Sequence, residues 1–541
     1  MSRDLILHHG TVLTHDPVQP VVDALAIRGA RVWAIGTRAQ VRAAAASDAL
    51  EVDLGGRGVV PGLIDAHLHF ELTAFAWQQV DAEAPTLAAL QARVAARAAA
   101  TPPGQWILGW GWDHNRWGGV LPDHRALDAA APHHPVYLSA KSGHAGWANS
   151  AAMAAAGLQR APAAVAGGEV CCQPDGRPTG VLLEAAMDLV TRVIPQPSLD
   201  DSVQAMDAAQ DRALAAGLTG VHDLDGTRAL AAWQVLRRQG RQRLRVCKSI
   251  PSHRLDEALA LGLRTGLGDE WIRIGGVKFF ADGALGPRTA WLLNPYEGES
   301  TYHGMPLWEP RELAAAVARA DQGGLAVWVH AIGDRAGRET LDALAATRGA
   351  GVGGSCRRLR HRLEHAQLLH PDDQARLAPL GVVASVQPIH ATSDMHIADQ
   401  HWGQRAADAY AFAALLARGA VLAFGSDSPV ETLSPLAGLH AAVTRRRADG
   451  SPGPDGWYPA QRLSIDAALR AYTIGPAYAA EEEQDKGTLA PGYLADLVVL
   501  DRPLAAVQAM ELADLQVLGT MVGGAWRWRS HDFQVGDGHA C

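Results

Sequence analysis

Short apolar runs alternate with helical stretches along most of the chain. From about residue 205, each helical stretch leads into an apolar run of strand length, such as GLTGVHDLD, RLRVCKSI and LAVWVHAIGD. With the first run, VVPGLIDAHLHF, the pattern predicts eight strands alternating with helices, the order of an α/β fold of the (β/α)8 TIM-like barrel type. A doubly wound open sheet is the alternative, which is weakened because no GxGxxG motif follows the first strand.

The two ends of the chain have a different pattern. Residues 1–57 and 481–541 contain short alternating runs broken by glycine, such as ALAIRGARVWAIG and GTLAPGYLADLVVLD, and this period predicts a small antiparallel sheet. Two organisations fit the pattern. Either both ends form one composite β-sandwich domain beside a barrel at 58–480, or they are two independent β-extensions.

The interval from about 76 to 201 interrupts the barrel rhythm and is several times longer than a βα loop. We therefore expect an inserted subdomain after the first barrel strand. It contains a cluster of tryptophans, a residue type that packs a core more often than it lines a site. Because the insertion begins at the predicted barrel mouth, we also expect an apolar or aromatic substrate pocket. Its candidate contacts are Trp110, Trp112, Asp113 and His144, with Asp282, Arg288 and Gln387 at barrel strand ends.

Composition narrows the class of protein. The net charge is 48 − 57 = −9 without basic blocks, which argues against nucleic acid as a partner. No run of 18 apolar residues and no signal-like start is present, so we expect neither a membrane span nor secretion. The five cysteines form no CxxC pair, which fits a reducing, cytoplasmic location. Homo-oligomer formation is left open.

Two histidines end the first barrel strand. His67 and His69 lie two residues apart in DAHLHF, so on a strand both imidazoles leave the same face. Buried imidazoles destabilise a fold unless a metal or a hydrogen bond satisfies them. Taken alone, the pair is as consistent with coincidence as with a site.

Four later strands each carry one further candidate ligand near the C-terminal end. Parallel barrel strands gather these ends at one mouth, so residues far apart in sequence converge there. Four imidazoles and one carboxylate suit zinc or a similar divalent ion. The candidates that join His67 and His69 are Lys278, His330, His365 and Asp427.

These residues and several longer phrases resemble the amidohydrolase superfamily. VVPGLIDAHLHF, VKFFADGALGPRTA, VHAIGDRA, RLEHAQ and GSDSPV are similar to its branch that contains N-substituted formamide deformylase. The resemblance covers nearly the whole chain and implies a composite terminal domain. It also implies that His67, His69, Lys278, His330, His365 and Asp427 form the metal site, with no ligand missing.

Lys278 requires separate treatment, since a protonated ammonium cannot bind a cation. In many superfamily members the equivalent lysine reacts with carbon dioxide, and the carbamate bridges two metals, so the resemblance implies two zinc ions bridged by N6-carboxylated Lys278. This chemistry needs a neutral amine, which nearby cations favour. The alternative is an unmodified lysine that binds substrate or pairs with Asp282, leaving one metal.

A metal-activated hydroxide would attack a carbonyl, and Asp427 would act as the catalytic proton carrier to the departing nitrogen. We therefore expect a hydrolase of carbon–nitrogen bonds other than peptide bonds, acting on a small molecule. The alternatives are a deaminase-type member with one metal and a catalytically silent scaffold on the same fold. The segment from His361 to His365 also spells the H-x-x-E-H peptidase signature, but that signature needs a helix where the barrel rhythm predicts a strand.

Overall fold

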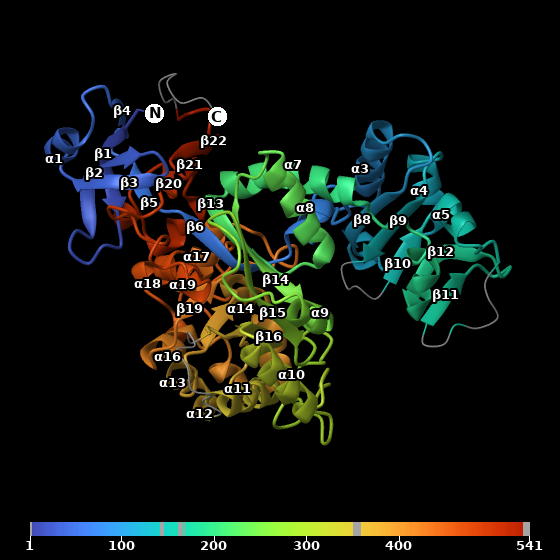
Figure 1. Cartoon of the computed structure of the whole chain (residues 1–541). Helices are drawn as coiled ribbons and strands as arrows, with labels where there is room; N and C mark the ends of the chain where they lie inside the picture. The colour runs from blue at the N-terminus through green and yellow to red at the C-terminus, as the bar shows by residue number, and fades with distance from the viewer. Residues whose placement is uncertain (1–2, 141–144, 161–164, 166–167, 350–358, 534–541) are drawn as a thin grey trace. The chain divides into compact units, whose positions relative to one another are not determined.

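The computed structural model of the chain describes residues 3–140, 145–160, 165, 168–349 and 359–533. The chain divides into two compact units, one combining Met1–Leu72 with Met206–Cys541 and the other formed by Thr73–Ala205 (Figure 1). The first unit contains a barrel and a sheet from both ends of the chain. The second unit is the segment inserted between the first two barrel strands.

Eight parallel strands form the predicted barrel. Two backbone hydrogen bonds connect the segment after the last strand to the first strand: Asp427 N donates to His67 O at 2.7 Å, and His69 N donates to Ser428 O at 2.9 Å. They bring the two edges of the sheet together, as in a closed barrel, so the doubly wound alternative is wrong. In spatial order the strands are β6 (Leu63–Leu68), β13 (Leu218–Asp223), β14 (Arg245–Pro251), β15 (Ile272–Phe280), β16 (Val327–Ala331), β17 (Arg362–His365), β18 (Val383–Val386) and β19 (Leu422–Phe424).

Helices connect the barrel strands. α10 buries Leu313, Val317 and Ala320 at helical spacing, as an amphipathic helix packed on a sheet does. The helical stretch before β18 is divided into α12 and α13, because Pro379 has no N–H to donate to the carbonyl of Ala375. None of the helices in the described ranges has the length and apolar composition needed to cross a bilayer. The helices are α2 (Phe70–Ala76), α7 (Leu199–Ala215), α8 (Thr227–Arg238), α9 (Leu255–Ala260), α10 (Pro310–Gln322), α11 (Asp334–Gly349), α12 (Pro371–Gln374), α13 (Leu377–Leu380), α14 (Pro388–Ser393), α15 (Met395–Trp402), α16 (Phe412–Ala417), α17 (Pro435–Thr444), α18 (Ile465–Tyr472) and α19 (Ile474–Ala479).

Strands from both ends of the chain share one sheet. The order is β22 (Ala525–Arg529), β21 (Val517–Val522), β20 (Leu497–Leu500), β5 (Gly58–Pro61), β1 (Leu5–Leu13), β2 (Val21–Arg28) and β3 (Arg31–Gly36), with β4 (Leu50–Asp53) paired to β1. β5 pairs with β20, which joins the two ends. The sheet is mixed and not antiparallel as expected, because β1 runs parallel to β4 and β5. Helix α1 (Arg38–Ala44) provides the crossover that parallel pairing requires.

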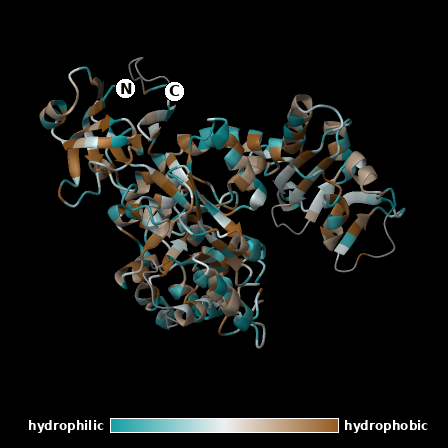
Figure 2. Ribbon diagram, in the orientation of Figure 1, coloured by the Kyte–Doolittle hydropathy of each residue, from teal (hydrophilic) through white to brown (hydrophobic). Residues whose placement is uncertain are grey.

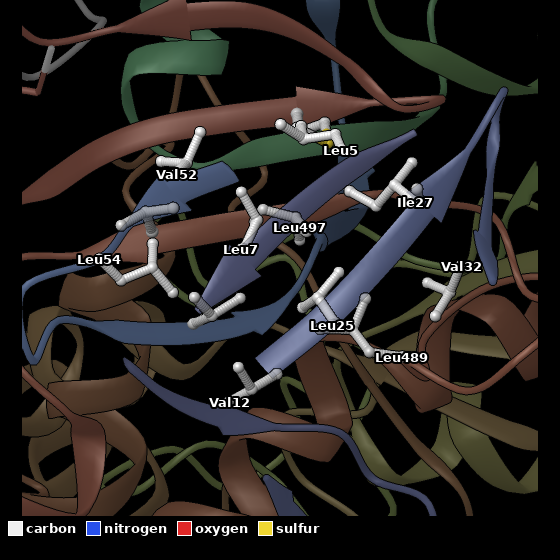
Figure 3. Close-up of a cluster of buried hydrophobic side chains, with 14 of the residues drawn as sticks. Leu5, Leu7, Val12, Leu25, Ile27, Val32, Val52, Leu54, Leu489 and Leu497 are labelled. Carbon is white, nitrogen blue, oxygen red and sulfur yellow. The ribbon is translucent and has the colours of Figure 1, made fainter. Parts of the chain in front are cut away.

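This terminal sheet has its own hydrophobic core (Figure 3). Alternate positions of β1, Leu5 and Leu7, face the core together with Leu25 of β2, and Leu497 enters from the C-terminal end of the chain. Figure 2 shows hydrophobic residues along these strands, whereas the helices carry both hydrophobic and hydrophilic residues. The core therefore combines side chains from both ends. The division into a terminal domain of residues 1–57 and 481–541 and a barrel of residues 58–480 stays a prediction.

The inserted unit contains a six-stranded sheet in the order β11-β12-β10-β9-β8-β7. Its buried core includes Leu90, Val94, Trp112, Leu138 and Trp147, so the segment folds around its own apolar side chains. Its strands are β7 (Val80–Asp81), β8 (Ile107–Trp112), β9 (Val136–Ala140), β10 (Ala145–Ala148), β11 (Gly168–Cys172) and β12 (Pro178–Glu184), and its helices are α3 (Leu87–Ala100), α4 (His124–Ala130), α5 (Ser150–Ala155) and α6 (Asp188–Thr191).

Candidate metal centre

Three predicted ligands meet closely at the C-terminal end of the barrel. His67 of β6, His365 of β17 and Asp427 after β19 each offer one donor atom, and these atoms lie within 4.8 Å of one another. All three residues are buried. His67 Nε2 lies 3.3 Å from Asp427 Oδ1. Two imidazoles and a carboxylate at this spacing are a suitable donor set for a borderline divalent metal such as zinc.

The other predicted ligands lie around these three. His69 Nε2 is 3.6 Å from Asp427 Oδ1, and the ring centroids of His330 and His365 are 4.4 Å apart. Lys278 is buried on β15, and its Nζ has no hydrogen-bond partner among the described residues. Burial lowers the pKa of Lys278 to about 8, which favours a neutral amine. The unpaired Nζ fits a group that would hold a metal after modification.

Left-handed backbone conformations direct two of the predicted ligands. His365 has φ 69° and Asp427 has φ 57°, a region that non-glycine residues rarely adopt. Strand alternation by itself would give His365 the same face as Leu363, whereas Glu364 faces the barrel interior and contacts His67. The positive φ turns His365 toward the mouth instead. Such strain costs roughly 1–3 kcal/mol per residue and is typical of functional sites.

Two carboxylates orient the histidine pair. His67 Nδ1 donates to Glu364 Oε2 at 2.6 Å, and His69 Nδ1 donates to Asp225 Oδ1 at 3.2 Å. Burial opposes ionisation of Glu364, but His67 outweighs it and holds the pKa of Glu364 below its usual value. Because a carboxylate only accepts, each Nδ1 carries the proton and each Nε2 keeps its lone pair for a metal.

Asp427 is held in the ionised form. Its Oδ2 accepts a hydrogen bond from His390 Nε2 at 3.3 Å. Burial raises the pKa of Asp427, but effects led by the hydrogen bond from His390 outweigh burial and place the pKa well below the usual value. A charged, buried carboxylate at the mouth can bind a cation and accept a proton.

Asp282, expected as a substrate contact, is engaged by the backbone. Burial raises its pKa to about 7. Next to it, His330 Nε2 donates to Gly283 O at 2.8 Å, which leaves the lone pair of His330 Nδ1 available to a metal. The carboxyl oxygens of Asp282 accept N–H groups from Trp291 at 2.8 Å, Ile332 at 3.0 Å and Gly333 at 2.8 Å.

The remaining candidate substrate contacts are divided between the two units. In the first unit, Arg288 pairs with Glu299 at 2.6 Å, and Gln387 is buried at the end of β18. In the inserted unit, Trp110 is half exposed and Asp113 is half-buried. Trp112 lies in that unit's core, and its Nε1 donates to Leu138 O at 2.9 Å. His144 lies outside the described residues, and a substrate role for each of these residues stays a prediction.

The H-x-x-E-H segment is not a helical peptidase motif. Arg362–His365 is the barrel strand β17. His361 precedes it and contacts Asp321 through Nε2 at 3.0 Å, away from the mouth. The two histidines therefore do not share a helix face, and the peptidase alternative is wrong.

Sequence reasoning missed Glu364, Asp225 and His390. Each follows or ends a predicted barrel strand: Glu364 precedes the predicted ligand His365, and Asp225 ends the run GLTGVHDLD. Their place at the C-terminal ends of strands could have identified them, because carboxylates and imidazoles at these ends converge at the barrel mouth.

Comparisons with known proteins agree with this geometry. A model described as the amidohydrolase family matches residues 50–526. The chain is 35% identical over 536 residues to Protein LONG AFTER FAR-RED 3 of Arabidopsis thaliana, covering 96% of this chain and 91% of that protein. It is 32% identical over 547 residues to N-substituted formamide deformylase of Arthrobacter pascens, covering 97% and 98%. An uncharacterized metal-dependent hydrolase from Pyrococcus horikoshii has a similar crystal structure, with a TM-score of 0.79, 29% identity, and coverage of 94% of this chain and 99% of that one.

The family match includes every barrel strand and all six residues predicted to bind metal. The two relatives exceed 30% identity across almost their whole lengths, so the similarity is more than a shared fold. Histidine and carboxylate donors at the barrel mouth supply the site that a metal-dependent hydrolase needs. The chain therefore belongs to the amidohydrolase family.

Proposed function

We propose that this protein is a metal-dependent hydrolase that cleaves the carbon–nitrogen bond of a small amide, of the N-substituted formamide type. One observation carries the proposal: donor atoms of His67, His365 and Asp427 lie within 4.8 Å of one another at the barrel mouth. The similarity to N-substituted formamide deformylase supports the bond type. The complete set of predicted ligands argues against a catalytically silent scaffold.

We propose two zinc ions, with Lys278 carboxylated between them. The neutral Lys278 Nζ would form a bond to the carbon of carbon dioxide and lose a proton, which gives an anionic carbamate. Burial of Lys278 supports this step because it lowers the pKa of Lys278 to about 8. His67, His69, His330, His365 and Asp427 are the remaining proposed ligands. Bound metal would polarise the amide carbonyl and lower the pKa of a water molecule.

Asp427 is the proposed proton carrier. Its ionised carboxylate can accept a proton at Oδ1 and deliver it to the nitrogen of the departing amine. His390 holds the other oxygen of Asp427 at 3.3 Å, so the side chain keeps one orientation during the transfer. Glu364 and Asp225 fix His67 and His69 in the tautomers that a metal needs.

An apolar substituent on the substrate is also proposed. Phe280 follows Lys278 by two positions on β15, and its ring centroid lies 4.9 Å from Lys278 Nζ and 5.2 Å from the ring of His330. Phe280 is 43% exposed, so the proposed centre has an accessible aromatic neighbour. An aromatic or aliphatic group on the amide nitrogen would bury that surface.

The test compares zinc-loaded and chelator-treated protein on a panel of N-formyl and N-acyl amines. We expect amine release by the zinc-loaded protein that disappears on chelation and is restored by adding zinc. Asp427→Asn is the matched control, since it keeps the size of the side chain but lacks the proton acceptor. Ammonia release from amidines by a one-metal protein would favour the deaminase alternative. Turnover of no substrate by fully loaded protein would contradict the proposal.

A further inference from the structure

Gln387 lies at the barrel mouth, immediately after β18. Its backbone is extended, with φ −118° and ψ 104°, so the side-chain alternation of β18 continues and Gln387 shares the face of Ser385. Ser385 is in register with Glu364 of β17. Because Glu364 contacts His67 inside the barrel, Gln387 also faces the interior, at the level of the strand ends.

The metal-centre residues flank this position on both sides. His365 ends the neighbouring strand β17, and Gly425, two residues before Asp427, donates its N–H to Val386 O at 3.1 Å. Three residues after Gln387, His390 contacts Asp427. A molecule bound at the centre would therefore lie near Gln387.

The carboxamide of Gln387 has no partner. The residue is 2% exposed, and neither Nε2 nor Oε1 has a hydrogen bond to any of the described residues. Gln374, which is equally buried, donates Nε2 to Leu369 O at 3.0 Å. Buried polar groups are rarely left unsatisfied, since they destabilise the folded state. An unpaired donor and an unpaired acceptor at the mouth indicate a ligand that supplies both.

We propose that Gln387 recognises the N–H of a secondary amide substrate through Oε1, while Nε2 donates to an acceptor on the same molecule. This inference rests on the proposed function and defines its substrate class more narrowly. A secondary amide carries an N–H, which the carbonyl oxygen of a carboxamide can accept, and a carbonyl oxygen as an acceptor. A tertiary amide or an ester lacks the N–H and would leave Oε1 unpaired, so the site would select against both.

The first measurement compares kcat/KM for an N-substituted formamide and for its N-methylated tertiary counterpart. We expect the wild type to prefer the secondary amide. Gln387→Met keeps the length of the side chain without its polar atoms, and it should lower kcat/KM for the secondary amide about tenfold to a hundredfold. The loss for the tertiary amide should be smaller, because that substrate uses only the hydrogen bond from Nε2. Metal content should stay at the wild-type level.

Thermal unfolding supplies a second readout. Gln387→Met removes an unpaired buried amide, so we expect its Tm to equal or exceed that of the wild type. Gln374→Met is the matched control and should lower Tm because it removes a formed hydrogen bond. An equal loss of Tm in both variants would make Gln387 a structural residue and overturn the inference.

The outcomes separate this inference from the proposed function. If fully loaded wild type hydrolyses no amide, the proposed function fails and the inference fails with it. If the wild type hydrolyses amides but Gln387→Met keeps the preference for the secondary amide, only the inference about Gln387 is wrong.

Discussion

Glu364→Gln should destabilise the metal-free protein strongly. Glu364 and Arg362 are both fully buried, with Oε1 and Nη1 4.0 Å apart. At an effective dielectric constant of about 20, two unit charges at this distance attract by about 4 kcal/mol. Removing one partner of a buried pair typically costs about 3–5 kcal/mol. Glutamine can still accept the hydrogen bond from His67 Nδ1, so the loss reports mainly on the charge.

The assay is urea-induced unfolding of chelator-treated protein. Glu309→Gln serves as a control, because this exposed carboxylate should change stability by only about 0.5 kcal/mol or less. In the double variant Arg362→Met/Glu364→Gln both charges are absent, and most of the lost stability should return. A loss below about 1 kcal/mol in Glu364→Gln would show that the buried charge pair does not stabilise the fold.

Three further predictions concern the proton carrier, the lysine and the terminal sheet. Asp427→Asn should lower kcat about 100-fold or more with a smaller change in metal content, measured by kinetics and elemental analysis; wild-type kcat at full metal would contradict it. Burial lowers the Lys278 pKa from 10.5 to about 8, so the unfolded chain binds the extra proton between these values. Between about pH 8 and pH 10.5, the urea midpoint of metal-free protein should therefore rise, and it should rise less in Lys278→Met. An equal rise of the urea midpoint in both proteins would be inconsistent with a lowered pKa of Lys278. Deleting the last 50 residues removes β20–β22 and should expose residues 1–57 to proteolysis; a soluble, fully active truncation would disprove the joint terminal sheet.

The barrel was predictable because its signal is local. Each strand is a short apolar run followed by a helical stretch, and the order of these runs already specifies parallel strands. The split between α12 and α13 could have been anticipated at Pro379. The parallel pairing of β1 with β4 and β5 could not, since it depends on where α1 returns the chain.

The convergence of the proposed ligands was predictable because parallel strands place their C-terminal ends at one mouth. Their partners were harder to predict, since no spacing in the sequence relates Glu364 to His67 or Asp225 to His69. The left-handed backbone at His365 and Asp427 has no glycine to indicate it. Burial and pairing of this kind arise only when the barrel closes.

Metal analysis of wild type and Lys278→Ala tests directly whether the barrel mouth holds a two-metal centre. We expect close to two divalent ions per chain in wild-type protein purified without chelator, because Lys278 and the five other proposed ligands lie at strand ends that converge at the mouth. Lys278→Ala should lose at least one of these ions while the protein stays folded. One ion in the wild type, with no loss in the variant, would contradict the two-metal centre.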